Sequence, residues 1–182
     1  MDIYKFNYKF PIKELLEFYN KKIKPNITEW QGIDLDKDNK DYGVDYAKGF
    51  FIHMVPYEEE TLPNFVAREF AKKLNLNCTI YTQFACVEKF CSLPWHKDNT
   101  IMSSCVNVLL MEKDQANVQF ADDKQGNNVR FYDYNCALLN TKEKFHRIVN
   151  KSVDRIIYRM IFLSKETSFD SLVSVIKKYN NN

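Results

Sequence analysis

Hydrophobic and polar positions follow two different periods along the chain, and the change falls near Asn75. Before it, Pro11–Ile23 and Pro63 to about Leu74 carry apolar residues at helical spacing, which predicts two amphipathic helices. The segment 33–47 between them is rich in Asp and Lys, which favours a solvated loop. We therefore expect residues 1–75 to form a helical and loop support for the part that follows.

Short apolar runs alternate with polar turns over residues 76–164, and runs of this length predict β-strands. The expected strands are Cys78–Cys86, Ile101–Met111, Ala116–Phe120, Val129–Tyr132, Cys136–Leu139, Phe145–Val149 and Arg155–Leu163. Many short strands separated by turns are typical of an antiparallel sandwich or barrel. An amphipathic pattern over Ser168–Tyr179 predicts that residues 165–182 form a C-terminal helix and tail.

The composition is that of an ordinary globular chain. Its 182 residues fit one domain, 1–182, and 45% of them are hydrophobic. Fourteen Phe and eleven Tyr favour a β-rich core, although such rings also stack on nucleobases. The net charge of +2 is too small to indicate nucleic acid, and no basic stripe with interleaved aromatics is visible. A nucleic-acid partner is therefore not expected, and the oligomeric state stays open.

The sequence also bears on the cellular setting. No run approaches the ~20 apolar residues of a membrane span, and Met1–Phe10 lacks the apolar core of a signal peptide. Five cysteines without a C-x-x-C spacing argue against a disulfide framework and against a thiolate zinc site. We expect a cytoplasmic protein without a membrane segment, whose cysteines are small buried hydrophobes.

The candidate chemistry lies in two of the three histidines. His96 and Asp98 form a His-x-Asp step, and residues i and i+2 of an extended segment point to the same side. His146, fifty residues later, would complete a set of two imidazoles and one carboxylate. That set leaves coordination positions open and suits non-haem Fe(II), whereas structural zinc prefers four closed ligands. His53 is expected to be a satisfied core or surface histidine.

An arginine adds to this pattern. Phe145–Val149 and Arg155–Leu163 are predicted to be adjacent strands joined by a turn, which would bring Arg155 near His146, nine residues before it. A guanidinium binds a carboxylate through two parallel hydrogen bonds. Arg155 is therefore the first candidate for binding an acidic cosubstrate, and Arg159, on the same face, is the second. The alternative is that both are surface charges on an edge strand.

The pattern His-x-Asp, about fifty residues, His-Arg-Ile, then Arg nine residues after His resembles the 2-oxoglutarate/Fe(II)-dependent dioxygenase superfamily, with the prolyl-hydroxylase-like branch favoured over the alkylation-repair branch. The resemblance covers about residues 78–163. It implies a mainly β fold with flanking helices and a double-stranded β-helix (jelly-roll, cupin-like) core. It also implies Fe(II) held by His96, Asp98 and His146, 2-oxoglutarate held by Arg155, and O2 that oxidises 2-oxoglutarate to succinate and CO2.

The sequence also offers candidates for further contacts to the cosubstrate. Many relatives carry a tyrosine on the strand after His-x-Asp, but 106–111 has none, so Asn107 and Tyr81 are the candidates here. Trp95 and Asn99 flank the ligands, where lining the substrate pocket and plain packing are equally good interpretations.

Three functions fit these residues. The first is hydroxylation of an amino-acid side chain, either free or in a peptide or protein, by a 2-oxoglutarate-dependent oxygenase. The second keeps the chemistry but demethylates methylated nucleobases. The third is a jelly-roll binding module without turnover, because a fold by itself does not establish chemistry.

Overall fold

The computed structural model describes residues 1–29, 49–98, 102–111, 116–163 and 165–180. Strands make up more of the described chain than helices do. Its strands are β1 Ile3–Lys5, β2 Thr28–Glu29, β3 Phe50–Val55, β4 Ile80–Val87, β5 Met102–Leu109, β6 Ala116–Ala121, β7 Arg130–Tyr132, β8 Cys136–Leu139, β9 Phe145–Asn150 and β10 Arg155–Leu163. Its helices are α1 Ile12–Phe18, α2 Leu62–Lys73 and α3 Phe169–Asn180, with short π-helical and 3-10 turns at Tyr19–Ile23 and Lys24–Asn26.

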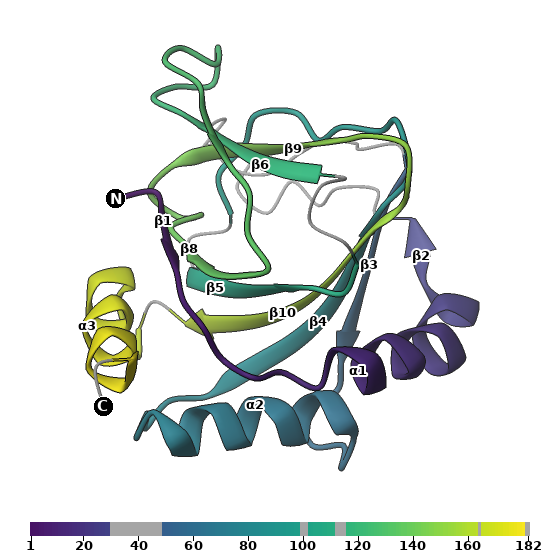
Figure 1. The fold of residues 1–182 in the computed structure, drawn as a ribbon, viewed down its shortest axis with the longest axis vertical. Helices are drawn as coiled ribbons and strands as arrows, with labels where there is room; N and C mark the ends of the chain where they lie inside the picture. The colour runs from purple at the N-terminus through teal and green to yellow at the C-terminus, as the bar shows by residue number, and fades with distance from the viewer. Residues whose placement is uncertain (30–48, 99–101, 112–115, 164, 181–182) are drawn as a thin grey trace.

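The strands form two antiparallel sheets that face each other (Figure 1). The larger sheet has the order β1-β8-β5-β10-β4-β3-β2, and the smaller has the order β7-β6-β9. Side chains from both sheets meet between them, as where Ile148 of β9 packs with Ile157 of β10. This arrangement is a double-stranded β-helix, which confirms the expected fold class.

Strand β10 shows how the sequence divides the two faces of the larger sheet. Side chains alternate along a strand. Ile157 and Ile161 point into the space between the sheets, whereas Tyr158 and Met160 belong to the cluster beneath the helices. Arg159 lies on the inner face with Ile157 and Ile161, so the strand carries a charge into the space between the sheets.

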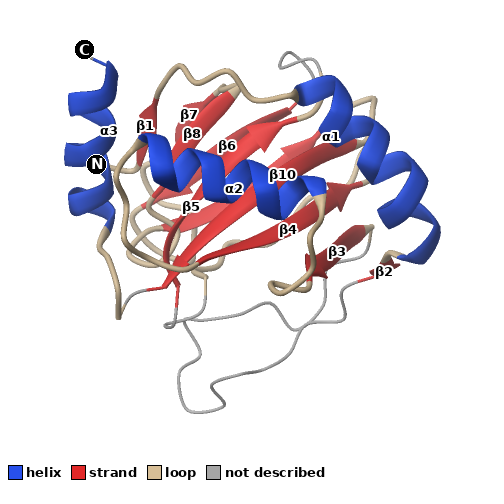
Figure 2. Ribbon diagram, turned by 90° about the horizontal axis from the view of Figure 1, so that it is seen from below, coloured by secondary structure: helices blue, strands red, loops and turns tan. Residues whose placement is uncertain are grey.

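The helices cover the outer face of the larger sheet. Figure 2 shows α1 and α2 lying across its strands, and α3 stands at the edge formed by β1 and β8. Two buried hydroxyl groups in this layer are paired: Tyr158 donates from its hydroxyl to the carbonyl of Pro63 at 2.7 Å, and Thr82 donates to Asn64 Oδ1 at 2.6 Å. These bonds anchor α2 on β4 and β10, the strands that form the floor of the interior. No helix in the described part of the chain is long and apolar enough to cross a membrane.

The N-terminal part differs from the expectation of helices and loops, because three strands of the larger sheet come from it. β1 and β2 have three and two residues, too few to show a period of two. β3 is longer, and its His53 pairs with Phe84 on the helix-covered face, away from the interior. The segment 33–47 and Asn99 lie outside the described residues. All five cysteines are free thiols, and three of them are buried.

Candidate metal centre

The centre begins with two histidines that face each other on neighbouring stretches of backbone. Residues 91–98 run antiparallel to β9 at the edge of the smaller sheet. His96 and His146 exchange both backbone hydrogen bonds, at 3.1 and 2.9 Å, which places them directly opposite one another. Their side chains therefore project from the same face, with ring centroids 4.3 Å apart. Both are buried, at 9% and 5% relative exposure.

Asp98 completes the group from the same segment. Its Oδ1 lies 3.9 Å from His96 Nε2 and 3.8 Å from His146 Nε2. The three candidate ligand atoms all lie within 4.8 Å of one another, and in the described part of the chain no cysteine or further acid joins the group. The structure thus brings together the three residues that the spacing singled out. Two imidazoles and one carboxylate leave room for further ligands, as non-haem Fe(II) sites require.

Backbone carbonyl groups fix which nitrogen of each imidazole carries the proton. His96 Nδ1 lies 2.9 Å from the carbonyl of Pro94, and His146 Nδ1 lies 3.4 Å from that of Lys144. A carbonyl oxygen can only accept, so Nδ1 carries the proton in both rings. Each Nε2 is then left with a free lone pair directed at the group, which is the tautomer that a metal ligand needs.

Burial and charge set the protonation states that metal binding requires. Burial lowers the pKa of His96, and burial followed by the neighbouring His96 lowers the pKa of His146 to about 3. Burial alone would raise the pKa of Asp98, but Arg159, then His146 and His96, hold that pKa below its usual range. At neutral pH the group therefore consists of two neutral imidazoles and a carboxylate, ready for a cation.

Arg159 is engaged with this group. Its NH2 donates to Asp98 Oδ2 at 3.0 Å and approaches Cys105 Sγ at 3.2 Å, while NH1 donates to Gln83 Oε1 at 3.1 Å. The guanidinium thus occupies one carboxylate oxygen of Asp98 and leaves Oδ1 for an ion. Gln83, on β4, was not a candidate in the sequence, because only the register of β4 against β10 places it beside Arg159.

Arg155 also lies inside the protein, at 1% relative exposure. The prediction that its strand is the neighbour of the His146 strand is wrong: β9 pairs with β6, whereas β10 lies between β4 and β5 in the opposite sheet. The turn 151–154 passes from one sheet to the other instead of closing a hairpin. The alternative of a surface charge on an edge strand is excluded as well, because β10 has neighbours on both sides.

The surroundings of Arg155 contain unused hydrogen-bonding capacity. Its NH2 donates to Tyr134 Oη at 2.7 Å, and its guanidinium lies 5.3 Å from the centre of that ring. Asn107 Nδ2 donates to the same oxygen at 3.1 Å. Among the described residues, neither Nε nor NH1 of Arg155 has a partner, nor has Asn107 Oδ1. A buried cation without a carboxylate is costly, so this cluster is complementary to an anionic ligand.

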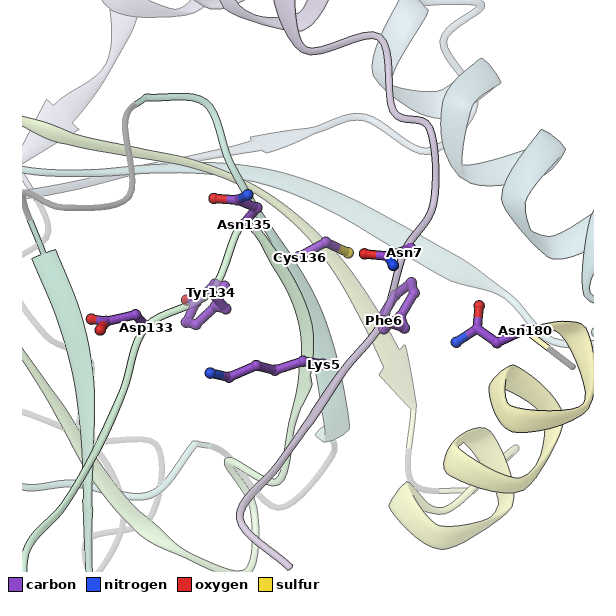
Figure 3. A pocket seen from close by; sticks show the side chains of 8 residues that line it. All are labelled: Lys5, Phe6, Asn7, Asp133, Tyr134, Asn135, Cys136 and Asn180. Carbon is purple, nitrogen blue, oxygen red and sulfur yellow. The ribbon is translucent and has the colours of Figure 1, made fainter.

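Tyr134 was absent from the sequence-based candidates. It lies in the connection between β7 and β8, and its position beside Arg155 depends on how that loop crosses the end of the sheet. Tyr81, which was a candidate, packs against the interior cluster that contains Tyr134 and Ile161, and its ring lies 5.5 Å from that of Tyr57. Tyr134 also lines a polar surface pocket of about 680 Å³ with Lys5 and Asp133 (Figure 3). That pocket contains none of the three candidate ligands.

Comparison with known proteins shows the same fold. No protein-family model and no curated protein sequence matches the chain. A prolyl-4-hydroxylase of Pseudomonas putida matches in structure with a TM-score of 0.60 at 11% identity, over 89% of this chain and 92% of that chain. The viral collagen prolyl hydroxylase of Paramecium Bursaria Chlorella virus-1, solved with 2-oxoglutarate, gives 0.57 at 14% identity, over 90% and 96%. The α-ketoglutarate-dependent epimerase SnoN gives 0.52 at 9% identity, over 84% and 73%. The chain has the fold of the 2-oxoglutarate/Fe(II) oxygenases.

Proposed function

We propose that this protein is a 2-oxoglutarate- and Fe(II)-dependent oxygenase that hydroxylates an amino-acid side chain, either free or within a peptide or protein. One observation carries the proposal: the interior holds both a three-ligand metal group and a buried arginine without a counterion among the described residues. This combination matches what an iron ion and a carboxylate cosubstrate would need.

The metal group fits Fe(II). His96, Asp98 and His146 would hold the ion, with both Nε2 atoms unprotonated and Asp98 Oδ1 available. Bound Fe(II) would supply the activation of O2 that is coupled to oxidation of 2-oxoglutarate to succinate and CO2. Arg159 keeps Asp98 ionised and holds its second oxygen, so that the carboxylate offers a single oxygen to the ion.

The arginine cluster fits the distal carboxylate of 2-oxoglutarate. Arg155 has unpaired donors at Nε and NH1, and either of them can bind a carboxylate in a fork together with the remaining hydrogen of NH2. Tyr134 Oη already accepts from Arg155 and Asn107, so its own proton points elsewhere and is available to a ligand oxygen. Unpaired donors of Arg155 and the hydroxyl of Tyr134 thus belong to one buried cluster. We assign the binding of the distal carboxylate to Arg155 with Tyr134.

A row of polar side chains connects the two halves of this site. Asn107, which contacts Tyr134, is the cross-strand partner of Arg159, which holds Asp98. The metal group and the cluster of Arg155, Tyr134 and Asn107 therefore belong to one continuous polar lining between the sheets. A molecule with an anionic group at each end, such as a keto-diacid, matches that lining.

The substrate class rests on the similarity of the fold and on the charge of the chain. The similarity of the fold to two prolyl hydroxylases favours an amino-acid side chain, and the net charge of +2 gives little attraction for nucleic acid. The test is release of succinate from 2-oxoglutarate by the Fe(II)-loaded protein, offered free amino acids, peptides or methylated oligonucleotides. Stimulation by an amino acid or peptide supports the proposal. Stimulation by methylated oligonucleotides alone would move the substrate to nucleobases, and no succinate under any condition would contradict the oxygenase.

A further inference from the structure

The backbone pairing of the two histidines is flanked on both sides by a cation packed on an aromatic ring. On one side, the guanidinium of Arg147 lies 4.5 Å from the centre of the Trp95 ring. On the other, Lys97 Nζ lies 4.7 Å from the centre of the Phe145 ring. Each pair joins the segment 91–98 to β9, and each is one residue away from the His96–His146 pair.

Strand geometry explains this placement. His96 and His146 form a hydrogen-bonded antiparallel pair, so the residues on either side of them form pairs without backbone hydrogen bonds. Side chains of such pairs approach more closely and point to the opposite face of the sheet from the histidines. The two cation–ring contacts therefore lie directly behind the candidate metal ligands.

The backbone ladder alone does not fix the register at this point. Ser92 pairs with Val149 and His96 pairs with His146, so four positions separate the partners on one strand and three on the other. The extra residue makes a bulge around Pro94, which has no N–H to donate. A slip of one residue here would turn His96 to the other face.

The contact between Arg147 and Trp95 is supported by a residue of β6 and by one of the connection between β6 and β7. Arg147 donates from Nε to Gln119 Oε1 at 2.9 Å, across to β6. The backbone of Gly126 lies so close to the indole that a Cβ there would be 2.4 Å from Trp95 Nε1. Gln119, Arg147 and Trp95 thus form a row across β6, β9 and the segment 91–98, and this row holds the indole in place.

We propose that Trp95 with Arg147, and Lys97 with Phe145, are positioning residues that fix His96 against His146 and so set the spacing of the two imidazoles. This inference rests on the proposed function, since it assigns those imidazoles to the metal. The residues do not contact the ion; they act through the register of the segment that carries His96 and Asp98.

The test is the affinity for Mn(II), followed by EPR, in Arg147→Met and Lys97→Met. Each variant keeps an apolar chain over the ring but removes the charge. We expect the dissociation constant for Mn(II) to rise about tenfold in each, the size of effect that groups behind metal ligands commonly have. Arg147→Lys, which retains a cation, should stay within about threefold of wild type. Arg130→Met is the matched control, because Arg130 lies in the same sheet but pairs with Asp2 and Asp122.

Thermal unfolding of the metal-free variants separates positioning from general damage. The inference predicts a weakened Mn(II) affinity in variants that remain folded, and wild-type affinity in a folded Arg147→Met and Lys97→Met would overturn it. If Arg147→Met does not fold, Lys97→Met decides alone. The proposed function fails differently: wild type would then bind no Mn(II), or would bind it without binding 2-oxoglutarate.

Discussion

Replacing Arg155 with Met should separate ligand binding from stability, because the structure buries this guanidinium without a carboxylate partner among the described residues. Hydrogen bonds to charged groups contribute about 1.5–3 kcal/mol each. Loss of two hydrogen bonds from this guanidinium to the distal carboxylate should therefore weaken the binding of 2-oxoglutarate by about 3–6 kcal/mol. This corresponds to a dissociation constant about 10²- to 10⁴-fold higher.

The same substitution should not destabilise the ligand-free protein. A buried charge without a counterion carries a desolvation penalty of several kcal/mol, so replacing it by an apolar side chain should stabilise the ligand-free protein by about 1–4 kcal/mol. The lost bond to Tyr134, at 2.7 Å, offsets about 1 kcal/mol of this. We expect a net gain between about zero and 3 kcal/mol, which raises the thermal midpoint by up to about 10 °C for a chain of this size.

Calorimetry on the Mn(II)-loaded protein measures the loss of affinity for 2-oxoglutarate. Thermal unfolding of the ligand-free protein measures the change in stability. A 2-oxo acid without the distal carboxylate should bind wild type and variant equally. Unchanged binding of 2-oxoglutarate would show that Arg155 is not the anchor. A loss of several kcal/mol in the ligand-free variant would show instead that Arg155 is a structural residue with a partner of its own.

Other contacts give three more predictions. Arg159→Met frees Asp98 Oδ2, and we expect Mn(II) affinity in an EPR titration to fall by about 10- to 100-fold; wild-type affinity would show that this arginine does not orient the ligand. The pKa of His146 is about 3 in the folded protein and about 6.5 unfolded, so the unfolded state binds more protons below pH 6.5. Stability of the metal-free protein should be fully present above that pH and lower by about 2 kcal/mol at pH 5 in urea titrations, and His146→Gln should flatten this dependence, whereas an equal slope would contradict the assignment. Gly126→Ala adds a Cβ 2.4 Å from Trp95 Nε1 at a φ of +81° and should cost about 1–3 kcal/mol in the same titrations; no loss would mean that the indole can move away.

The alternation of short apolar runs and polar turns along the sequence was sufficient to predict most of the strands of the core. In Arg155–Leu163 the apolar side chains alternate between two buried faces, and the structure confirms this range as β10. The pairing of strands was harder to predict, because the turn 151–154 is short enough for a hairpin. The pairing of β9 with β6, and of β10 with β4 and β5, shows that the chain changes sheets there.

The candidate site was predictable to the extent that it is local in sequence. The spacing within His96–Asp98 follows from the period of a strand, and the structure places His146 beside both. Gln83 and Tyr134 could not be found in this way, because they reach the arginines only through the register of β4 and the path of the β7–β8 connection. The cation–ring contacts of Trp95 and Arg147 likewise require knowing which residues face each other across the pair.

The central claim is that His96, Asp98 and His146 hold Fe(II) together with 2-oxoglutarate. Its most direct test is anaerobic addition of Fe(II) and 2-oxoglutarate to the protein, with wild type and His96→Ala followed by visible absorption. We expect wild type to develop a metal-to-ligand charge-transfer band and His96→Ala to develop none, with unchanged folding by circular dichroism. Absence of the band from folded, iron-loaded wild type, or an equal band in His96→Ala, would contradict the claim.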